Sequence, residues 1–159
     1  MDGEPRHAFR PDAPKAAPRS IYGCQATAIT LRSISGDVMQ KRTPKEDVLV
    51  GGLDDWADAG WVLQSARLSG VSDPVALRDA ALGLVSEVLI ERLMVAGDII
   101  GGKHVPWRCS AEEATARIRR EWLDEWGDEV PTPGAITWLS NTAAGDEIAQ
   151  SVLERELLT

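Results

Sequence analysis

This sequence of 159 residues has few of the side chains that most catalytic and metal sites require. It contains two histidines and two cysteines, and only His104 and Cys109 lie outside the first 44 residues. These two residues could share a zinc ion only if carboxylates supplied the other two ligands of a tetrahedral site. We therefore expect no metal and no cofactor.

Motifs that bind phosphate or present a nucleophile are also missing. The glycine pairs Gly51-Gly52 and Gly101-Gly102 are isolated and typical of turns, and no G-x-S-x-G segment is present. Many of the clustered carboxylates fall in the expected first turns of helices, where negative charge complements the helix dipole. The sequence therefore favours a protein without enzyme activity.

Long apolar runs are absent as well. No stretch of about 18 to 20 apolar residues exists that could cross a membrane. No secretory signal precedes the two cysteines, Cys24 and Cys109, which are far apart in the chain. We expect no membrane span and a reduced, cytoplasmic compartment.

Aromatic residues other than tryptophan are rare, since the chain has one tyrosine and one phenylalanine but six tryptophans. An indole buries a large area, so we expect the tryptophans to hold much of the core. They are Trp56, Trp61, Trp107, Trp122, Trp126 and Trp138.

Among the charged residues, acidic side chains outnumber basic ones, and the excess is unevenly distributed along the chain. Residues 1–44 contain seven Lys and Arg against four Asp and Glu, a net charge of +3, whereas residues 45–159 contain ten against twenty-one, a net charge of −11. Such a surface repels phosphate backbones and attracts basic proteins. The alternative is that the acidic surface only maintains solubility.

The N-terminal segment differs from the rest of the chain in composition. Residues 1–44 hold five of the nine prolines and show little periodicity, which is typical of a disordered basic tail. A start at Met39 is a second explanation for the residues that precede it. We expect residues 45–159 to form a single acidic globular domain.

The first expected elements of this domain are a short strand and a helix. Apolar residues 48–50 predict a strand or turn that ends at Gly51-Gly52. Asp54 is a candidate N-cap for a helix that continues to about Leu68 and ends at Gly70.

The most apolar helix of the sequence follows. Ser72 or Asp73 can cap it, and Pro74 occupies its first turn. Apolar residues continue on nearly all sides as far as Val95, which is typical of a central, buried helix. Gly97 is expected to end it.

A hairpin and a capped helix come next. Segment 98–105, DIIGGKHV, predicts two short strands around a Gly-Gly turn, closed by Pro106. Ser110 and Glu113 form a capping-box pattern that opens a helix to about Trp126.

The C-terminal segment predicts a strand and a last helix. The strand covers residues 135–139, and the helix runs from Ala143 or Ala144 to Leu157 with Ile148, Val152 and Leu153 buried. The expected fold is α+β and helix-dominated, with four helices and a small sheet of two to three strands.

Two segments resemble winged helix-turn-helix domains of the MarR-like and PadR-like regulators. They are residues 90–97, IERLMVAG, and residues 138–145, WLSNTAAG, in which a strand, a Thr-x-x-Gly turn and the closing helix follow one another. The resemblance implies a winged-helix-like scaffold and, for a member of that family, DNA binding.

The charges do not fit that function. In the family a recognition helix enters the major groove and a two-stranded wing follows it. Here the helix expected at residues 111–126 carries three arginines against five carboxylates, a balance of −2, and one clear strand follows. Binding of nucleic acid is therefore disfavoured, although not excluded.

The favoured function is that of a small, non-catalytic interaction protein, or an inhibitor of the immunity type, that binds a basic partner protein. The alternative is a winged-helix transcriptional regulator. Charge density alone selects two groups of candidate protein-binding residues: Asp54, Asp55 and Asp58, and Glu121, Asp124, Glu125, Asp128 and Glu129. Nothing in the sequence indicates an oligomeric state.

Overall fold

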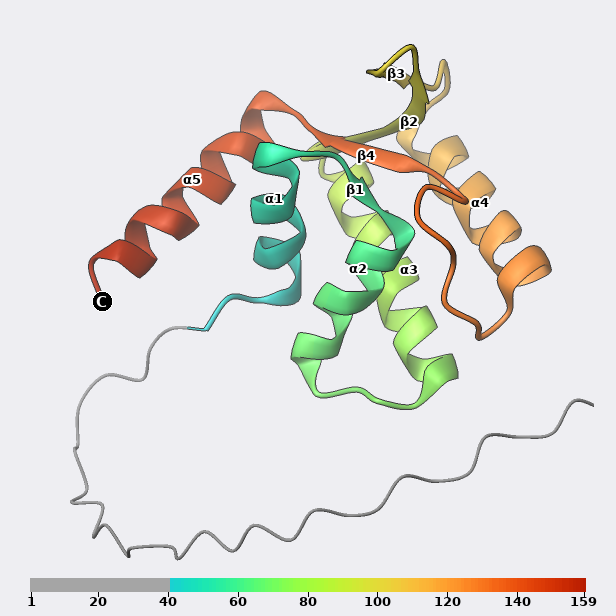
Figure 1. Cartoon of the computed structure of the whole chain (residues 1–159), viewed down its shortest axis with the longest axis horizontal. Coiled ribbons are helices and arrows are strands. Elements are labelled where there is room, and N and C mark those ends of the chain that lie inside the picture. The colour runs from blue at the N-terminus through green and yellow to red at the C-terminus, as the bar shows by residue number, and fades with distance from the viewer. Residues whose placement is uncertain (1–40) are drawn as a thin grey trace, which may run out of the picture. The chain divides into compact units, whose positions relative to one another are not determined.

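The computed structural model describes residues 41–159 (Figure 1). The expectations for residues 1–40 of the proline-rich segment and for a start at Met39 fall outside these residues, whereas Thr43 and Pro44, which were expected in the tail, begin helix α1. The described part is α+β and helix-dominated, as predicted. It has five helices instead of four and four strands instead of two to three. The helices are α1 (Pro44–Asp54), α2 (Ala59–Ala66), α3 (Pro74–Ile90), α4 (Ala111–Glu121) and α5 (Ala143–Leu157), and the strands are β1 (Ala57–Asp58), β2 (Met94–Ile100), β3 (Lys103–Pro106) and β4 (Trp138–Asn141).

The four strands form one antiparallel sheet in the order β1-β4-β2-β3. The last strand of the sequence therefore lies between two earlier ones. Helices α1, α2 and α3 lie on one side of the sheet, with α5 beside α1 at one end of the domain and α4 at the other end (Figure 1). This arrangement joins the start and the end of the described chain.

Helix α1 replaces the strand expected at residues 48–50. A capping box opens the helix, since Thr43 accepts from the Glu46 amide while the Glu46 carboxylate accepts from the Thr43 amide. The two glycines that indicated a turn lie inside this helix. A Cβ atom at Gly51 would collide with the Trp61 indole and one at Gly52 with the Asn141 side chain, so these glycines allow close packing.

The predicted N-cap of the next helix is also wrong. Asp58, not Asp54, caps α2 by accepting from the Trp61 amide at 2.8 Å. Residues 57–58 are extended because they pair with β4, and this pairing delays the start of the helix. Gly70 does end the segment as expected, with a φ of 82° after the 3-10 turn Arg67–Ser69.

Helix α3 starts as predicted, with Asp73 as its N-cap and Pro74 in its first turn, but it ends at Ile90. Residues 94–95, which were assigned to the helix, belong to strand β2. Gly97 lies within that strand, where a Cβ atom would collide with the backbone of Val105 on β3. A short apolar run at a helix end does not distinguish a further helical turn from a buried strand.

The predicted hairpin is confirmed. Strands β2 and β3 pair around Gly101 and Gly102, whose φ angles of 60° and 74° need glycine. The capping box of α4 is confirmed too, because Ser110 accepts from the Glu113 amide and the Glu113 carboxylate accepts from the Ser110 amide. Helix α4 then continues into a π-helical turn at Trp122–Trp126.

The last strand and helix are close to the prediction. Strand β4 begins three residues later than expected, at Trp138, and Thr142 caps α5 at the expected place. Ile148 is 38% exposed, contrary to expectation, because Ala149 and Val152 occupy the buried face of α5.

Tryptophan contributes less to the core than predicted. Trp122 is fully buried, whereas Trp61 is 42% exposed and the other four indoles are half-buried. Leucine, valine and alanine from all five helices and from the sheet fill the core. Within residues 41–159, no helix has both the length and the apolar character needed to cross a bilayer.

Candidate functional site

Of the first group of candidate protein-binding residues, Asp54, Asp55 and Asp58, the structure places Asp58 apart from the other two. The Asp58 carboxylate accepts from the Trp61 amide and, at 3.1 Å, from the Gly134 amide, so both of its oxygens hold the fold together. Asp54 and Asp55 are exposed at the C-terminal end of α1. Asp55 Oδ1 accepts from the Trp56 amide at 2.7 Å, so Asp54 and the second oxygen of Asp55 remain accessible to a partner.

A third carboxylate joins them from a distant part of the chain. Asp54, Asp55 and Asp146 line one recess of about 350 Å³, which we call the acidic recess. Asp146 lies in the first turn of α5, and the antiparallel pairing of β4 with β1 and β2 brings it to the end of α1. The other residues of the recess are Gly52, Leu53, Trp56, Ser140 and Asn141.

Asn141 connects the two helices at this recess. Its Nδ2 donates to the Leu49 carbonyl of α1 at 2.8 Å and to Asp146 Oδ1 at 3.0 Å. Its Oδ1 is buried and has no hydrogen-bond partner among residues 41–159. The Asn141 side chain thus fixes the Asp146 carboxylate of α5 relative to helix α1.

Asp54 and Asp55 lie at the end of α1 where a positive charge is favoured by the helix dipole. The C-terminal end of a helix carries partial negative charge, and the last turn of α1 contains no basic residue. No cation of residues 41–159 lies within 4 Å of the carboxylates of the acidic recess. A positively charged group placed there would relieve this repulsion.

The carboxylates at the N-terminal end of α1 are paired. Glu46 binds Arg155 of α5 at 2.9 Å, and Arg42 binds both Glu156 at 2.6 Å and Asp47 at 3.4 Å. Hydrogen bonding from Arg155, with a smaller effect from the Thr43 amide, lowers the pKa of Glu46 from 4.5 to about 2. These acidic groups hold α1 to α5.

The second predicted group lies on the π-helical turn and the loop after it. Glu121 is half-buried and accepts from Arg117 Nε at 3.0 Å. Asp124, Glu125, Asp128 and Glu129 are exposed. These four carboxylates therefore lie on the surface of the turn and of the loop that follows it.

The two candidate zinc ligands have other surroundings. His104 Nε2 lies 2.9 Å from the Trp138 carbonyl, and Cys109 is exposed and unpaired. In the part of the chain that the structure describes, no three His, Cys, Asp or Glu side chains come together in a way that could hold a metal ion.

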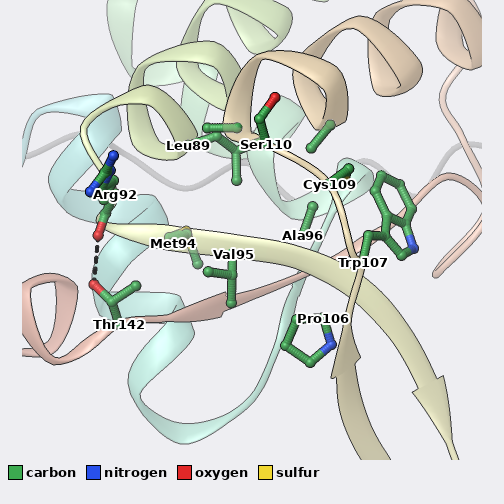
Figure 2. Close-up of a pocket in the computed structure, with 12 residues that line it drawn as sticks. Leu89, Arg92, Met94, Val95, Ala96, Pro106, Trp107, Cys109, Ser110 and Thr142 are labelled. Atoms are coloured by element: carbon green, nitrogen blue, oxygen red, sulfur yellow. Dashed lines mark hydrogen bonds between the residues drawn. The ribbon is translucent and has the colours of Figure 1, made fainter.

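A second pocket lies between the end of α3, the strands β2 and β3, and the start of α4 (Figure 2). Its volume is about 340 Å³ and most of its lining is apolar. Sequence reasoning missed this apolar pocket because its residues are spread over positions 89–142. They are Leu89, Arg92, Met94, Val95, Ala96, Pro106, Trp107, Cys109, Ser110, Ala111, Ala114 and Thr142.

Comparison of the chain with models of protein families, with curated proteins and with solved structures found no match.

Proposed function

We propose that this chain is a small, acidic, non-catalytic interaction domain, with an inhibitor of the immunity type as one form, that binds a basic partner protein at the acidic recess. One observation carries the proposal. Carboxylates from α1 and α5, 91 or 92 positions apart in sequence, converge on one recess, and no cation among residues 41–159 pairs with them.

The recess suits a lysine or arginine side chain of the partner. Such a side chain can place its alkyl stem against Trp56 and its charge among the three carboxylates. Exposed ion pairs contribute about 0.2–1 kcal/mol each, so three of them correspond to a change of roughly threefold to 160-fold in affinity. The net charge of −11 on residues 45–159 adds long-range attraction that salt weakens.

A labelled hexa-arginine peptide tests this proposal, with binding followed by fluorescence anisotropy. We expect binding at a salt concentration of about 20 mM that weakens strongly at about 200 mM. The triple variant Asp54→Asn/Asp55→Asn/Asp146→Asn should lose about threefold to 160-fold in affinity.

The matched control removes the same charge from the second group, in the variant Asp124→Asn/Glu125→Gln/Asp128→Asn. We expect it to weaken peptide binding by less than about threefold, because those carboxylates are exposed and do not line the acidic recess. Equal losses in the two triple variants would show that only overall charge matters and would refute a role for the acidic recess.

A winged-helix regulator is the second candidate, and one observation favours it. Helices α2 and α3 are linked through the short Gly70–Asp73 turn, as in helix-turn-helix motifs, and a hairpin follows α3. The charges oppose it, because residues 74–106 hold three Lys and Arg against four Asp and Glu, a net charge of −1. Phosphate neutralisation on this surface would be weak.

Anisotropy with a mixed-sequence DNA duplex at low salt distinguishes the two candidates. The interaction proposal predicts that the duplex does not bind at micromolar protein. Salt-sensitive duplex binding that survives the recess triple variant would favour the regulator instead.

We also propose a cytoplasmic location for the protein. The support for this part is Cys109, an exposed free thiol that a reducing compartment would preserve.

A further inference from the structure

The apolar pocket is lined at one end by Arg92, an exposed arginine whose backbone is strained. Arg92 has a φ of 57°, and it is the one non-glycine residue with a positive φ among residues 41–159. The main chain is held in this conformation, because the Arg92 amide donates to the Leu89 carbonyl and the Leu93 amide donates to the Val88 carbonyl. The Arg92 carbonyl also accepts from Thr142 Oγ1 at 2.8 Å, as Figure 2 shows.

Glycine is the residue that this position favours. Helices commonly end with a left-handed residue just beyond the C-cap, and glycine adopts this conformation without the steric cost that a Cβ atom imposes. Arg92 bears that cost directly after the C-cap Glu91 of α3. The backbone alone therefore gives no reason for an arginine here.

The Arg92 side chain has no ion-pair partner in the described chain. No carboxylate of residues 41–159 lies within 4 Å of its guanidinium group, and the neighbouring Glu91 is paired with Lys45. Figure 2 shows Arg92 and Thr142 at one end of the pocket, with Trp107 and Cys109 at the other end. The pocket thus combines an apolar wall with one unpaired positive charge at its end.

The remaining polar side chains of the pocket are uncharged. Thr142 Oγ1 donates to the Arg92 carbonyl and accepts from the Gly145 amide, and Ser110 Oγ accepts from the Glu113 amide, which leaves the Ser110 O–H free to donate. Cys109 has only a thiol, which is a weak donor. A ligand would therefore find one positive charge at Arg92, one hydroxyl donor at Ser110 and an apolar surface elsewhere.

We propose that this pocket binds a small monocarboxylate with an apolar body, whose carboxylate pairs with Arg92 and whose hydrocarbon part lies against Leu89, Met94, Ala96 and Ala114. At about 30 Å³ for each water molecule in the liquid, 340 Å³ corresponds to about eleven waters, which sets the size of the ligand. A straight-chain acid of about ten non-hydrogen atoms fits this volume. The proposal is independent of the acidic recess.

Octanoate is the probe, and the full-length chain is the protein. We expect octanoate to bind with an affinity no weaker than millimolar in a calorimetric titration, and to shift the amide resonances of Met94, Ala96 and Ala111. Octan-1-ol and octylammonium have the same chain without the negative charge, and we expect each to bind at least tenfold more weakly. Equal binding of the three compounds would overturn the assignment of Arg92 as the carboxylate partner.

The variant Arg92→Gly separates binding from folding. Because glycine suits the left-handed backbone, its thermal unfolding midpoint should equal or exceed that of the parent chain. We expect octanoate affinity to fall at least tenfold, while Arg92→Lys retains part of it. Undiminished octanoate binding by Arg92→Gly would overturn the proposal, as would a failure of the parent chain to bind octanoate at millimolar concentration.

Alkylation of Cys109 reports the position of the ligand. The thiol is exposed and lines the pocket, so bound octanoate should slow its reaction with N-ethylmaleimide, measured by mass spectrometry of the Cys109 peptide. The same protection is expected in the variant Asp54→Asn/Asp55→Asn/Asp146→Asn, so failure of one site is distinguishable from failure of the other. Binding without protection of Cys109 would place octanoate elsewhere and refute the pocket.

Discussion

The two ends of helix α1 carry carboxylates in opposite circumstances. At the N-terminal end, Glu46 and Asp47 lie where the helix dipole favours negative charge, and both are paired with arginines. At the C-terminal end, Asp54 and Asp55 lie where the dipole opposes negative charge, and no cation of residues 41–159 pairs with them.

The difference separates structural acidic groups from available ones. Removing a carboxylate at the first end breaks contacts between α1 and α5, whereas removing one at the second end relieves repulsion. Neutralisation should therefore change stability in opposite directions at the two ends. The carboxylates at the C-terminal end of α1 therefore hold no ion pair within residues 41–159, whereas those at the N-terminal end do.

The largest expected effect comes from Asn141, the side chain that joins α1 to α5 at the acidic recess. In the variant Asn141→Ala, the buried Leu49 carbonyl loses a donor and Asp146 loses its tether to α1. We expect a loss of about 1–3 kcal/mol in unfolding free energy, measured by urea denaturation. The neighbouring variant Ser140→Ala is the control, and an equal loss there would show that the strand, not the amide, matters.

The second-largest expected effect is a pH dependence of stability that comes from Glu46 at the N-terminal end of α1. Since the pKa of Glu46 is about 2 in the folded chain and near 4.5 when unfolded, its contribution is complete above pH 4.5 and is lost as the pH falls toward 2. The variant Glu46→Gln should lower Tm at pH 7 and flatten the fall in Tm between pH 4.5 and 2. Solvent screening of Arg155 should keep this effect below that of Asn141→Ala.

If Glu46→Gln kept the full acid dependence of the parent chain, the pair with Arg155 would not stabilise the fold. An Asp124→Asn variant, which lies far along the chain from this pair, serves as the control for general charge effects. Its Tm at pH 7 is expected to stay close to that of the parent chain.

A smaller effect is expected from the cap of α1. The variant Thr43→Ala removes the hydroxyl that accepts from the Glu46 amide, and should lower unfolding free energy by about 1 kcal/mol. Thr43→Ser keeps the hydroxyl and should lose much less. A loss as large in Thr43→Ser would indicate that the threonine methyl group, not the cap, is responsible.

The smallest expected effect has the opposite sign. In Asp54→Lys a positive charge replaces a negative one at the C-terminal end of α1, which should raise unfolding free energy by about 0.3–1 kcal/mol at low salt. The same variant should bind the hexa-arginine peptide more weakly. Asp124→Lys is the matched control, and a decrease in stability for Asp54→Lys would remove the contrast between the two ends.

The elements that sequence predicted correctly are those with local chemical signals. Ser110 with Glu113, Asp73 with Pro74, and the Gly101-Gly102 turn all act on backbone groups within four residues. Thr142 belongs to the same class, because it caps α5 three residues before Gly145. Such signals are complete in a short window, and each was placed to within a residue or two.

The errors occurred where distant residues decide the local structure. Gly51 and Gly52 indicated a turn, but Trp61 and Asn141 approach them closely enough to require glycine inside a helix. Residues 94–95 continue the apolar pattern of helix α3, which predicted a helix there. They are extended because they pair with residues 140–141 of β4, and this pairing is not visible in the local sequence. The acidic recess was half predicted, since Asp54 and Asp55 were chosen on charge density while Asp146 was not.

The sequence by itself determined the helix-dominated α+β composition, the caps and the hairpin turn, and the strongly acidic character of the part after residue 44. Tertiary structure alone decided which carboxylates lie together in one recess. Insertion of β4 between β1 and β2 brings Asp146 to Asp54 and Asp55, while Asp58 is engaged in the fold through the Gly134 amide. The physical reason is the distance along the sequence over which the interactions act. Caps and turns need hydrogen bonds to residues only a few positions away, whereas carboxylates from distant segments come together only when those segments pack against each other.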